Sequence, residues 1–282
     1  MIEDTRAGQK IPKTINCFYH ANKYHLSEEE WKSWITTPFS GITHFTWAFF
    51  KPMHDGSIEI PFQEANELQL WNAVSVAHAN GVKVLVSLGG WSDSRNFPII
   101  AADPFRILRF VDACQALVRK FSLDGIDIDW EYPGHADHNG TSYDSENCVH
   151  LIRALGSALK QSGKELNLNI PGRTLIGNLT GDACGFKIRE LIEYVDKFNI
   201  MAYDLFATTS NCGSSSWHSS ALLDDGLDEH WSASRAARYY LDLGIPARKM
   251  QLGLAFYGRG YRNCSGLGAS YEGLGGYKGS GI

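Results

Sequence analysis

The segment "FSLDGIDIDWEYPG", from Phe121 to Gly134, places acidic residues in a stretch that otherwise reads as a buried strand. Acidic side chains are normally excluded from strands and interiors unless something compensates their charge. Within the segment, three carboxylates alternate with three apolar side chains: Asp127, Asp129 and Glu131 with Ile126, Ile128 and Trp130. Because side chains in a strand alternate between its two faces, the three carboxylates share one face. The sequence thus predicts a buried strand with one acidic face.

Apolar, strand-like segments recur along the chain and alternate with amphipathic helical segments. The predicted strands are 14–19, 42–50, 82–88, 123–130, 166–170, 197–203 and 250–256. The predicted helices lie near 27–36, 64–80, 104–120, 145–162, 186–195 and 232–243. This alternation predicts an α/β fold with parallel strands and crossover helices.

Two architectures fit this alternation, the doubly wound open sheet and the closed (β/α)8 TIM barrel. No G-x-G-x-x-G pattern follows the first strand, and "SLGGW" at 87–91 lacks its spacing, which disfavours a dinucleotide-binding open sheet. In a barrel, one strand face meets the helices and the other faces the lumen, and the active site lies at the C-terminal ends of the strands. A barrel therefore explains the acidic face, with Asp127, Asp129 and Glu131 pointing into the lumen and rising toward its mouth.

Carboxylates on one strand face lie ~6.5–7 Å apart, and in a low-dielectric lumen three of them cannot all ionise cheaply. At least one is expected to stay protonated near neutral pH, as general acid catalysis requires. The alternative is a structural acidic ladder that Arg or Lys neutralises. It is disfavoured because no other predicted strand offers a basic residue at lumen parity near its end. Asp124, at the opposite parity, is predicted to be structural.

Composition excludes several classes of protein. A net charge of -5 over 282 residues offers no basic surface for nucleic acid or anionic membranes. The longest apolar run, "VKVLVSLGGW", is too short to span a bilayer, and "MIEDTRAGQK" has no signal-peptide h-region.

Six scattered cysteines without a CxxC pair allow either disulfides or buried thiols such as Cys114. Three sequons, at Asn139, Asn178 and Asn263, favour a secreted, extracellular protein.

The motif "DGIDIDWEYP" resembles the signature of the family 18 glycoside hydrolases, the chitinases. "SLGGW" at 87–91 and "MAYDL" at 201–205 resemble two further landmarks of that family, in the expected order, and the similarity extends from "FYHANKY" to "GLAFYGRGY". The resemblance implies a (β/α)8 barrel that cleaves β-1,4 bonds between N-acetylglucosamine units with retention. It implies binding of chitin or N-acetylglucosamine oligomers, no cofactor, no metal, and a monomer when the protein is complete.

The resemblance also assigns roles to residues. This family is an exception among retaining glycosidases, because the acetamido carbonyl of the substrate is the nucleophile. Glu131 matches the proton donor, Asp129 the residue that orients the acetamido group, and Asp127 the residue that shares a proton with Asp129 from below. Tyr203 matches a catalytic residue on the opposite wall, whose hydroxyl faces the oxazolinium ion.

The remaining candidates are predicted to bind substrate. Asp204 matches a sugar-binding position, and Met201 lies at the same strand parity as Tyr203, in the pocket beneath. Gly90 and Trp91 end the third strand, and Tyr132 adjoins the acid. Trp217, in the loop 211–223, is a candidate surface on which a sugar ring stacks. For Trp91 and Trp217, ordinary packing within the fold is the alternative to sugar binding. His135 and His138 have HxxH spacing but no evident third metal ligand, and solvated loop histidines are expected.

The sequence also departs from the family. The segment "LNLNIPGRTLIGN" lacks the small-residue pattern expected of the fifth strand, which questions the pocket floor there. We expect residues 1–256 to form the barrel with strands one to seven, and 257–282 to begin an inserted α+β region. On this expectation the barrel is truncated before its eighth strand and the segment is poorly stable. The alternatives are a catalytically silent binder of chitin oligosaccharides, an endo-acting hydrolase of N-glycan cores, and a protein inhibitor of other glycosidases.

Overall fold

The computed structural model describes residues 13–21, 41–173, 181–206, 215–227, 230–272 and 274–279. Its strands are β1 (Asn16–His20), β2 (His44–Pro52), β3 (Ile58–Glu59), β4 (Lys83–Gly89), β5 (Gly125–Asp129), β6 (Glu165–Pro171), β7 (Lys197–Met201), β8 (Met250–Leu252), β9 (Tyr257–Tyr261) and β10 (Leu274–Gly279). Its α-helices are α2 (Gln63–Ala79), α3 (Phe97–Ala101), α4 (Pro104–Phe121), α5 (Asp144–Gln161), α6 (Ile188–Leu191) and α7 (Ala233–Asp242). Three short 3₁₀ turns complete it: η1 (Ser94–Asn96), η2 (Ala136–His138) and η3 (Ala247–Lys249). The helix predicted near 27–36 lies outside the described residues.

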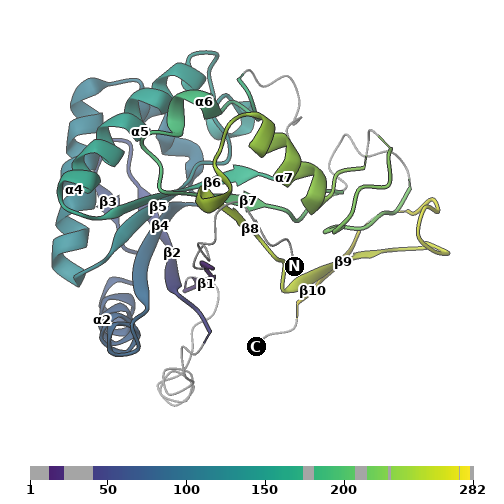
Figure 1. Ribbon diagram of the computed structural model, residues 1–282, viewed down its shortest axis with the longest axis horizontal. Helices are drawn as coiled ribbons and strands as arrows, with labels where there is room; N and C mark the ends of the chain where they lie inside the picture. The colour runs from purple at the N-terminus through teal and green to yellow at the C-terminus, as the bar shows by residue number, and fades with distance from the viewer. Residues whose placement is uncertain are drawn as a thin grey trace, which may run out of the picture.

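Seven parallel strands form one sheet in the order β1-β2-β4-β5-β6-β7-β8, and β3 pairs antiparallel with β2. Figure 1 shows this sheet curled, with the long helices on its outer side. The central strands β4 to β7 are buried almost throughout, whereas β1 and β8, the edges of the described sheet, are partly exposed. Near-continuous burial is typical of parallel strands that helices cover. The predicted parallel α/β barrel wall is confirmed.

Helix α4 shows how the local sequence builds the outer layer. The Asp103 carboxylate caps its start by accepting the N–H groups of Phe105 and Arg106, and Pro104 occupies the first turn. One stripe of the helix is buried at helical spacing: Ile107, Phe110, Val111, Cys114, Leu117, Val118 and Phe121. The helix ends at Ser122, whose φ of 55° is left-handed. Among the described helices, none is both long and apolar enough to cross a membrane.

Several predicted elements are shorter in the structure, two of them markedly. The strand predicted over 250–256 ends at Leu252, because its partner β7 ends at Met201 and Ile200 pairs with Leu252 as the last residue of the ladder. The helix predicted over 186–195 is reduced to the single turn of α6. After β8 the chain forms the antiparallel pair β9–β10 at one side of the sheet (Figure 1). That residues from 257 onward begin a separate inserted region stays a prediction.

A charged cluster joins the starts of three strands at the N-terminal end of the sheet. Glu165 on β6 accepts a hydrogen bond from His44 Nε2 at 3.1 Å and is also paired with Lys83 Nζ. Burial alone would raise the pKa of Glu165, but the hydrogen bonds and positive charges of His44 and Lys83 lower it to about 2. The ionised carboxylate therefore stabilises the folded state.

We predict that Glu165→Gln lowers the free energy of unfolding by roughly 2–3 kcal/mol at pH 7. Because the folded pKa is depressed, this contribution is fully present above the unfolded pKa near 4.5 and is lost as the pH falls toward 2. Urea unfolding at pH 7, 4.5 and 3 measures it. Glu193→Gln, at an exposed position, is the matched control. An equal pH dependence in the parent and in Glu165→Gln would contradict the prediction.

Candidate active site

The predicted acidic face of β5 is present and buried. Asp127 is fully buried and Asp129 is 4% exposed, while Ile126, Ile128 and Trp130 on the other face belong to the hydrophobic core. Trp130 stacks on Phe97 of α3 at a ring-centroid distance of 5.3 Å. Asp124, at the opposite parity, accepts hydrogen bonds from Val84 N (2.9 Å) and His78 Nε2 (2.8 Å), which agrees with its predicted structural role.

The side chains that donate hydrogen bonds to the buried Asp127 carboxylate come from three nearby strands. Its carboxylate accepts hydrogen bonds from Ser87 Oγ on β4 (2.6 Å), Asn169 Nδ2 on β6 (3.1 Å) and Asn199 Nδ2 on β7 (2.8 Å). Burial raises its pKa to about 7, and these three donors oppose the shift. Sequence reasoning missed all three residues. The signal was polar residues at lumen parity in otherwise apolar strands: Ser87 in "VLVSLGG", Asn167 and Asn169 in "LNLNI", and Asn199 in "KFNIM".

Asn169 also answers the doubt about the fifth strand. Its Oδ1 accepts a hydrogen bond from Asn199 Nδ2 at 2.9 Å while its Nδ2 donates to Asp127. The amide therefore links the acidic strand β5 to β7 through two hydrogen bonds. It takes the place of the small residues that the family pattern led us to expect.

Burial raises the pKa values of both Asp129 and Glu131. The pKa of Asp129 lies well above its ordinary value, first because of burial and then because of the charges of Glu131 and Asp127. The pKa of Glu131 rises to about 7, first through burial and further through the charge of Asp204, against hydrogen bonds from Tyr132 and the Trp91 N–H. Asp129 Oδ1 is buried and receives no hydrogen bond from the described residues. The predicted retention of protons on this face near neutral pH agrees with these shifts.

The turn after β4 lies directly against the end of β5. A Cβ on Gly89, whose φ is 106°, would lie 2.4 Å from the Asp129 carbonyl oxygen, so only glycine fits this approach. Gly90 N donates to the same oxygen at 2.9 Å. The buried Ser94 Oγ shares its single proton between the carbonyls of Gly90 and Asp129, and it accepts the Glu131 N–H at 2.9 Å. These contacts fix the main chain that carries Glu131.

Tyr203 and Asp204, just beyond the end of β7, lie close to this face. Burial raises the pKa of Tyr203, and the charges of Asp129 and Glu131 raise it further. Met201 is buried at 8% exposure, and Tyr132 beside the acid is buried to the same degree. The structure therefore brings together Glu131, Asp129, Asp127, Tyr203, Asp204, Gly90, Trp91 and Tyr132. The place of the Met201 side chain in the pocket stays a prediction.

Asp204 is held by the first strand of the β9–β10 hairpin, which sequence reasoning did not connect to the site. Its carboxylate accepts Arg259 Nε at 2.7 Å and the Tyr257 hydroxyl at 2.7 Å. The Asp204 backbone has a left-handed φ of 51°. Because Tyr257 and Arg259 lie 53 and 55 residues away in sequence, only the tertiary structure shows this contact.

Two predicted residues take different places. The Trp217 ring stacks on His230 at a centroid distance of 4.0 Å, so one of its faces is already covered, and its role as a sugar platform stays a prediction. The expectation of a solvated His138 is wrong: this side chain is 4% exposed, because the Trp91 and His135 rings pack against it. Within the described part of the chain, no three His, Cys, Asp or Glu side chains are grouped to hold a metal ion. Cys114 and Cys148 are buried free thiols.

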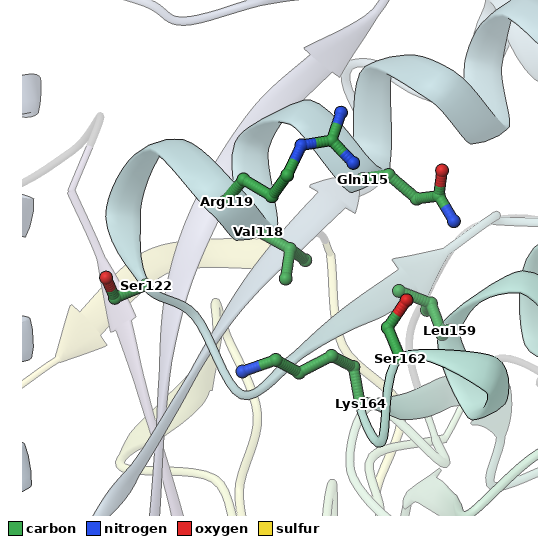
Figure 2. Close-up of a pocket in the computed structure, with 7 residues that line it drawn as sticks. All are labelled: Gln115, Val118, Arg119, Ser122, Leu159, Ser162 and Lys164. Carbon is green, nitrogen blue, oxygen red and sulfur yellow. The ribbon is translucent and has the colours of Figure 1, made fainter.

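A separate hollow lies at the other end of the sheet. Figure 2 shows it between the last turns of α4 and α5, with Arg119 and Lys164 among its lining residues. Its volume is about 310 Å³. Lys164 Nζ donates to the Leu123 carbonyl at 2.6 Å, as expected of a cation near a helix C-terminus. This hollow lies near the first residues of β5 and β6, away from the carboxylates at the strand ends, and is not the candidate site.

We predict that Arg259→Met weakens the attachment of β9 to Asp204 by about 1–2 kcal/mol, the contribution of a charge-assisted hydrogen bond. Amide hydrogen exchange over Tyr257–Tyr261 should accelerate about 10-fold, while exchange in β5 is unchanged. Arg262→Met, at an exposed position of the same segment, is the control. Unchanged protection of β9 in Arg259→Met would show that the Asp204 contact does not hold the hairpin.

Comparison with known proteins shows the family and fold of the chain. The chain is 28% identical over 262 residues to "Chitinase 1" of Aphanocladium album, covering 84% of this chain and 60% of that protein. It is 28% identical over 263 residues to the "chitinase-like effector" of Moniliophthora roreri, covering 90% and 60%. The chain thus spans about three fifths of the length of these relatives. Its fold resembles the Ostrinia furnacalis Group IV chitinase in complex with allosamidin, with a TM-score of 0.77, 24% identity, and coverage of 96% of this chain and 72% of that one. The family model described as "Glycosyl hydrolases family 18" matches residues 14–279, and the chain therefore belongs to this family.

Proposed function

We propose that this chain is the catalytic part of a chitinase that hydrolyses β-1,4 bonds between N-acetylglucosamine units with retention. The observation that carries the proposal is the buried ladder of Asp127, Asp129 and Glu131, which Tyr203 and Asp204 face from the end of β7. The names of the relatives, and the allosamidin in the similar Ostrinia furnacalis structure, support this substrate class.

Glu131 is the proton donor in this proposal. With a pKa of about 7, its carboxyl keeps a proton at neutral pH and can give it to the glycosidic oxygen. After the leaving sugar departs, the same group as carboxylate activates water. Only one catalytic acid is required, because the acetamido carbonyl of the substrate is the nucleophile.

Asp129 and Tyr203 would hold the acetamido group between them. The unbonded Asp129 Oδ1 is an acceptor for the acetamido N–H, and the Tyr203 hydroxyl stays a neutral donor because its pKa is raised. Asp127, fixed by Ser87, Asn169 and Asn199, exchanges a proton with Asp129 from below. A negative ladder then stabilises the positive oxazolinium ion that forms beside it.

A silent binder of chitin oligosaccharides is the second candidate, since one relative is named a chitinase-like effector. The presence of Glu131 at the acid position favours the enzyme. Secretion is also proposed: of the three sequons, Asn139 and Asn263 are exposed, and Asn178 lies outside the described residues.

We predict that Glu131→Gln lowers kcat for a chromogenic chitin oligomer by ~10²–10⁴-fold, because the amide cannot donate the proton. Oligomer binding and thermal unfolding should be nearly unchanged, since the amide is of similar size. Steady-state kinetics and titration calorimetry measure both. Substantial turnover by the Gln variant would remove Glu131 from the role of acid, and an inactive parent that still binds oligomers would favour the silent binder.

The acetamido mechanism predicts a sharp substrate requirement. Oligomers of glucose, which lack the acetamido group, should not be hydrolysed, whereas a thiazoline analogue of the oxazolinium ion should inhibit strongly, because it resembles the transition state. Product analysis on matched chitin and cellulose oligomers, together with inhibition kinetics, tests this. Comparable hydrolysis of cellulose oligomers would indicate a nucleophile supplied by the protein.

A further inference from the structure

His138 lies in the loop between β5 and α5, as the last residue of η2. Its side chain is 4% exposed, and its Nδ1 contacts the main-chain carbonyl oxygen of Glu131. A carbonyl oxygen can only accept a hydrogen bond, so Nδ1 carries the proton in this contact. The imidazole thus donates to the peptide unit of the residue whose side chain is the candidate acid.

The same imidazole supports Trp91 in the loop after β4. The two rings meet edge to face, with a centroid distance of 4.6 Å and an angle of 67°. Trp91 is 54% exposed, so it keeps apolar surface open to a ligand, and its main-chain N–H is a hydrogen-bond donor to the Glu131 carboxyl. His138 therefore touches Glu131 directly through the carbonyl and again through Trp91.

The loop around His138 is well anchored. Asp144, at the start of α5, accepts the N–H groups of Gly134 (2.9 Å) and Thr141 (3.1 Å). Asn139 Nδ2 reaches across to the Arg95 carbonyl at 3.1 Å and joins this loop to the loop after β4. Because both loops are fastened to each other, a change at His138 is transmitted to Glu131 and Trp91 rather than absorbed by the loop.

We propose that His138 is a positioning residue that places the Glu131 acid through its Nδ1–H and the exposed Trp91 surface through its ring. The proposal rests on the proposed function, since it assigns His138 a role in the same reaction. It separates two contributions by atom: the donor nitrogen determines where the acid lies, and the ring determines where Trp91 presents its face to a sugar.

Two substitutions separate these contributions. His138→Phe keeps a ring beside Trp91 but removes the donor, and it should lower kcat on a chitin oligomer by about 10–100-fold with little change in KM, because small misplacements of a catalytic group are costly. His138→Asn keeps a side-chain N–H near the position of Nδ1 but removes the ring. It should keep kcat close to that of the parent and raise KM about 2–10-fold, the range of one aromatic contact.

His150→Phe and His150→Asn are the matched controls, because His150 lies exposed on α5. They should leave both constants unchanged. Unchanged kinetics in both His138 variants would overturn the proposal. Equal losses of activity in both variants, in proportion to their losses of thermal stability, would also overturn it, because His138 would then act only by packing.

A measurement without substrate keeps this proposal distinct from the proposed function. In a long-range ¹H–¹⁵N spectrum, the His138 signals, assigned by their loss in His138→Asn, should show a protonated Nδ1 at neutral pH. The indole N–H signal of Trp91, assigned with Trp91→Phe, should shift in His138→Asn and not in His150→Asn. An unprotonated Nδ1 or an unmoved Trp91 signal would overturn the positioning role. A parent that hydrolyses no chitin oligomer, with these signals as expected, would instead overturn the proposed function.

Discussion

The desolvation of three carboxylates, Asp127 and Asp129 on one face of β5 and Glu131 just beyond its end, is the constraint on which the site depends. A buried, uncompensated carboxylate is strongly unfavourable, so the strand can exist only if neighbours donate hydrogen bonds or the groups retain protons. Both occur here. Asp127 receives three donors from β4, β6 and β7, and burial nevertheless keeps the pKa values of Asp127, Asp129 and Glu131 raised. Of the three groups, Glu131 is the one beyond the strand end, where a substrate can take its proton.

The sheet can hold such a strand because its other face packs normally. Ile126, Ile128 and Trp130 belong to the hydrophobic core, and α3 covers the Trp130 ring through Phe97. In a parallel barrel wall, one face of each central strand packs against the helices and the other faces the lumen. Polar residues on the lumenal face therefore do not disturb the helix layer. The fold thereby tolerates a concentration of acid that an open, two-sided apolar sheet could not hold.

Loops give the acid its position. The β4 turn is pressed against β5 through Gly89 and Gly90, Ser94 binds the Glu131 N–H, and His138 binds the Glu131 carbonyl. On the opposite wall, Arg259 and Tyr257 hold Asp204. Rigid strand ends and short, hydrogen-bonded loops together produce a preorganised site, in which donors need not rearrange as charge develops.

Much of this could be predicted from the sequence, because the signals are local. Period-two alternation predicted the acidic face of β5, and the spacing of apolar segments predicted the parallel strands and the long helices within a few residues. The partners could not be predicted, because a hydrogen bond between Asp127 and Asn199 joins residues 72 positions apart and depends on strand register. The same holds for Arg259 on Asp204 and for the burial of His138, which the sequence alone indicated as a solvated loop residue. The sequence by itself determined which strand carries the acids and which way they point, since both follow from the backbone period. The tertiary structure alone decided which side chains compensate and position them, because those contacts form only when distant strands and loops are brought together.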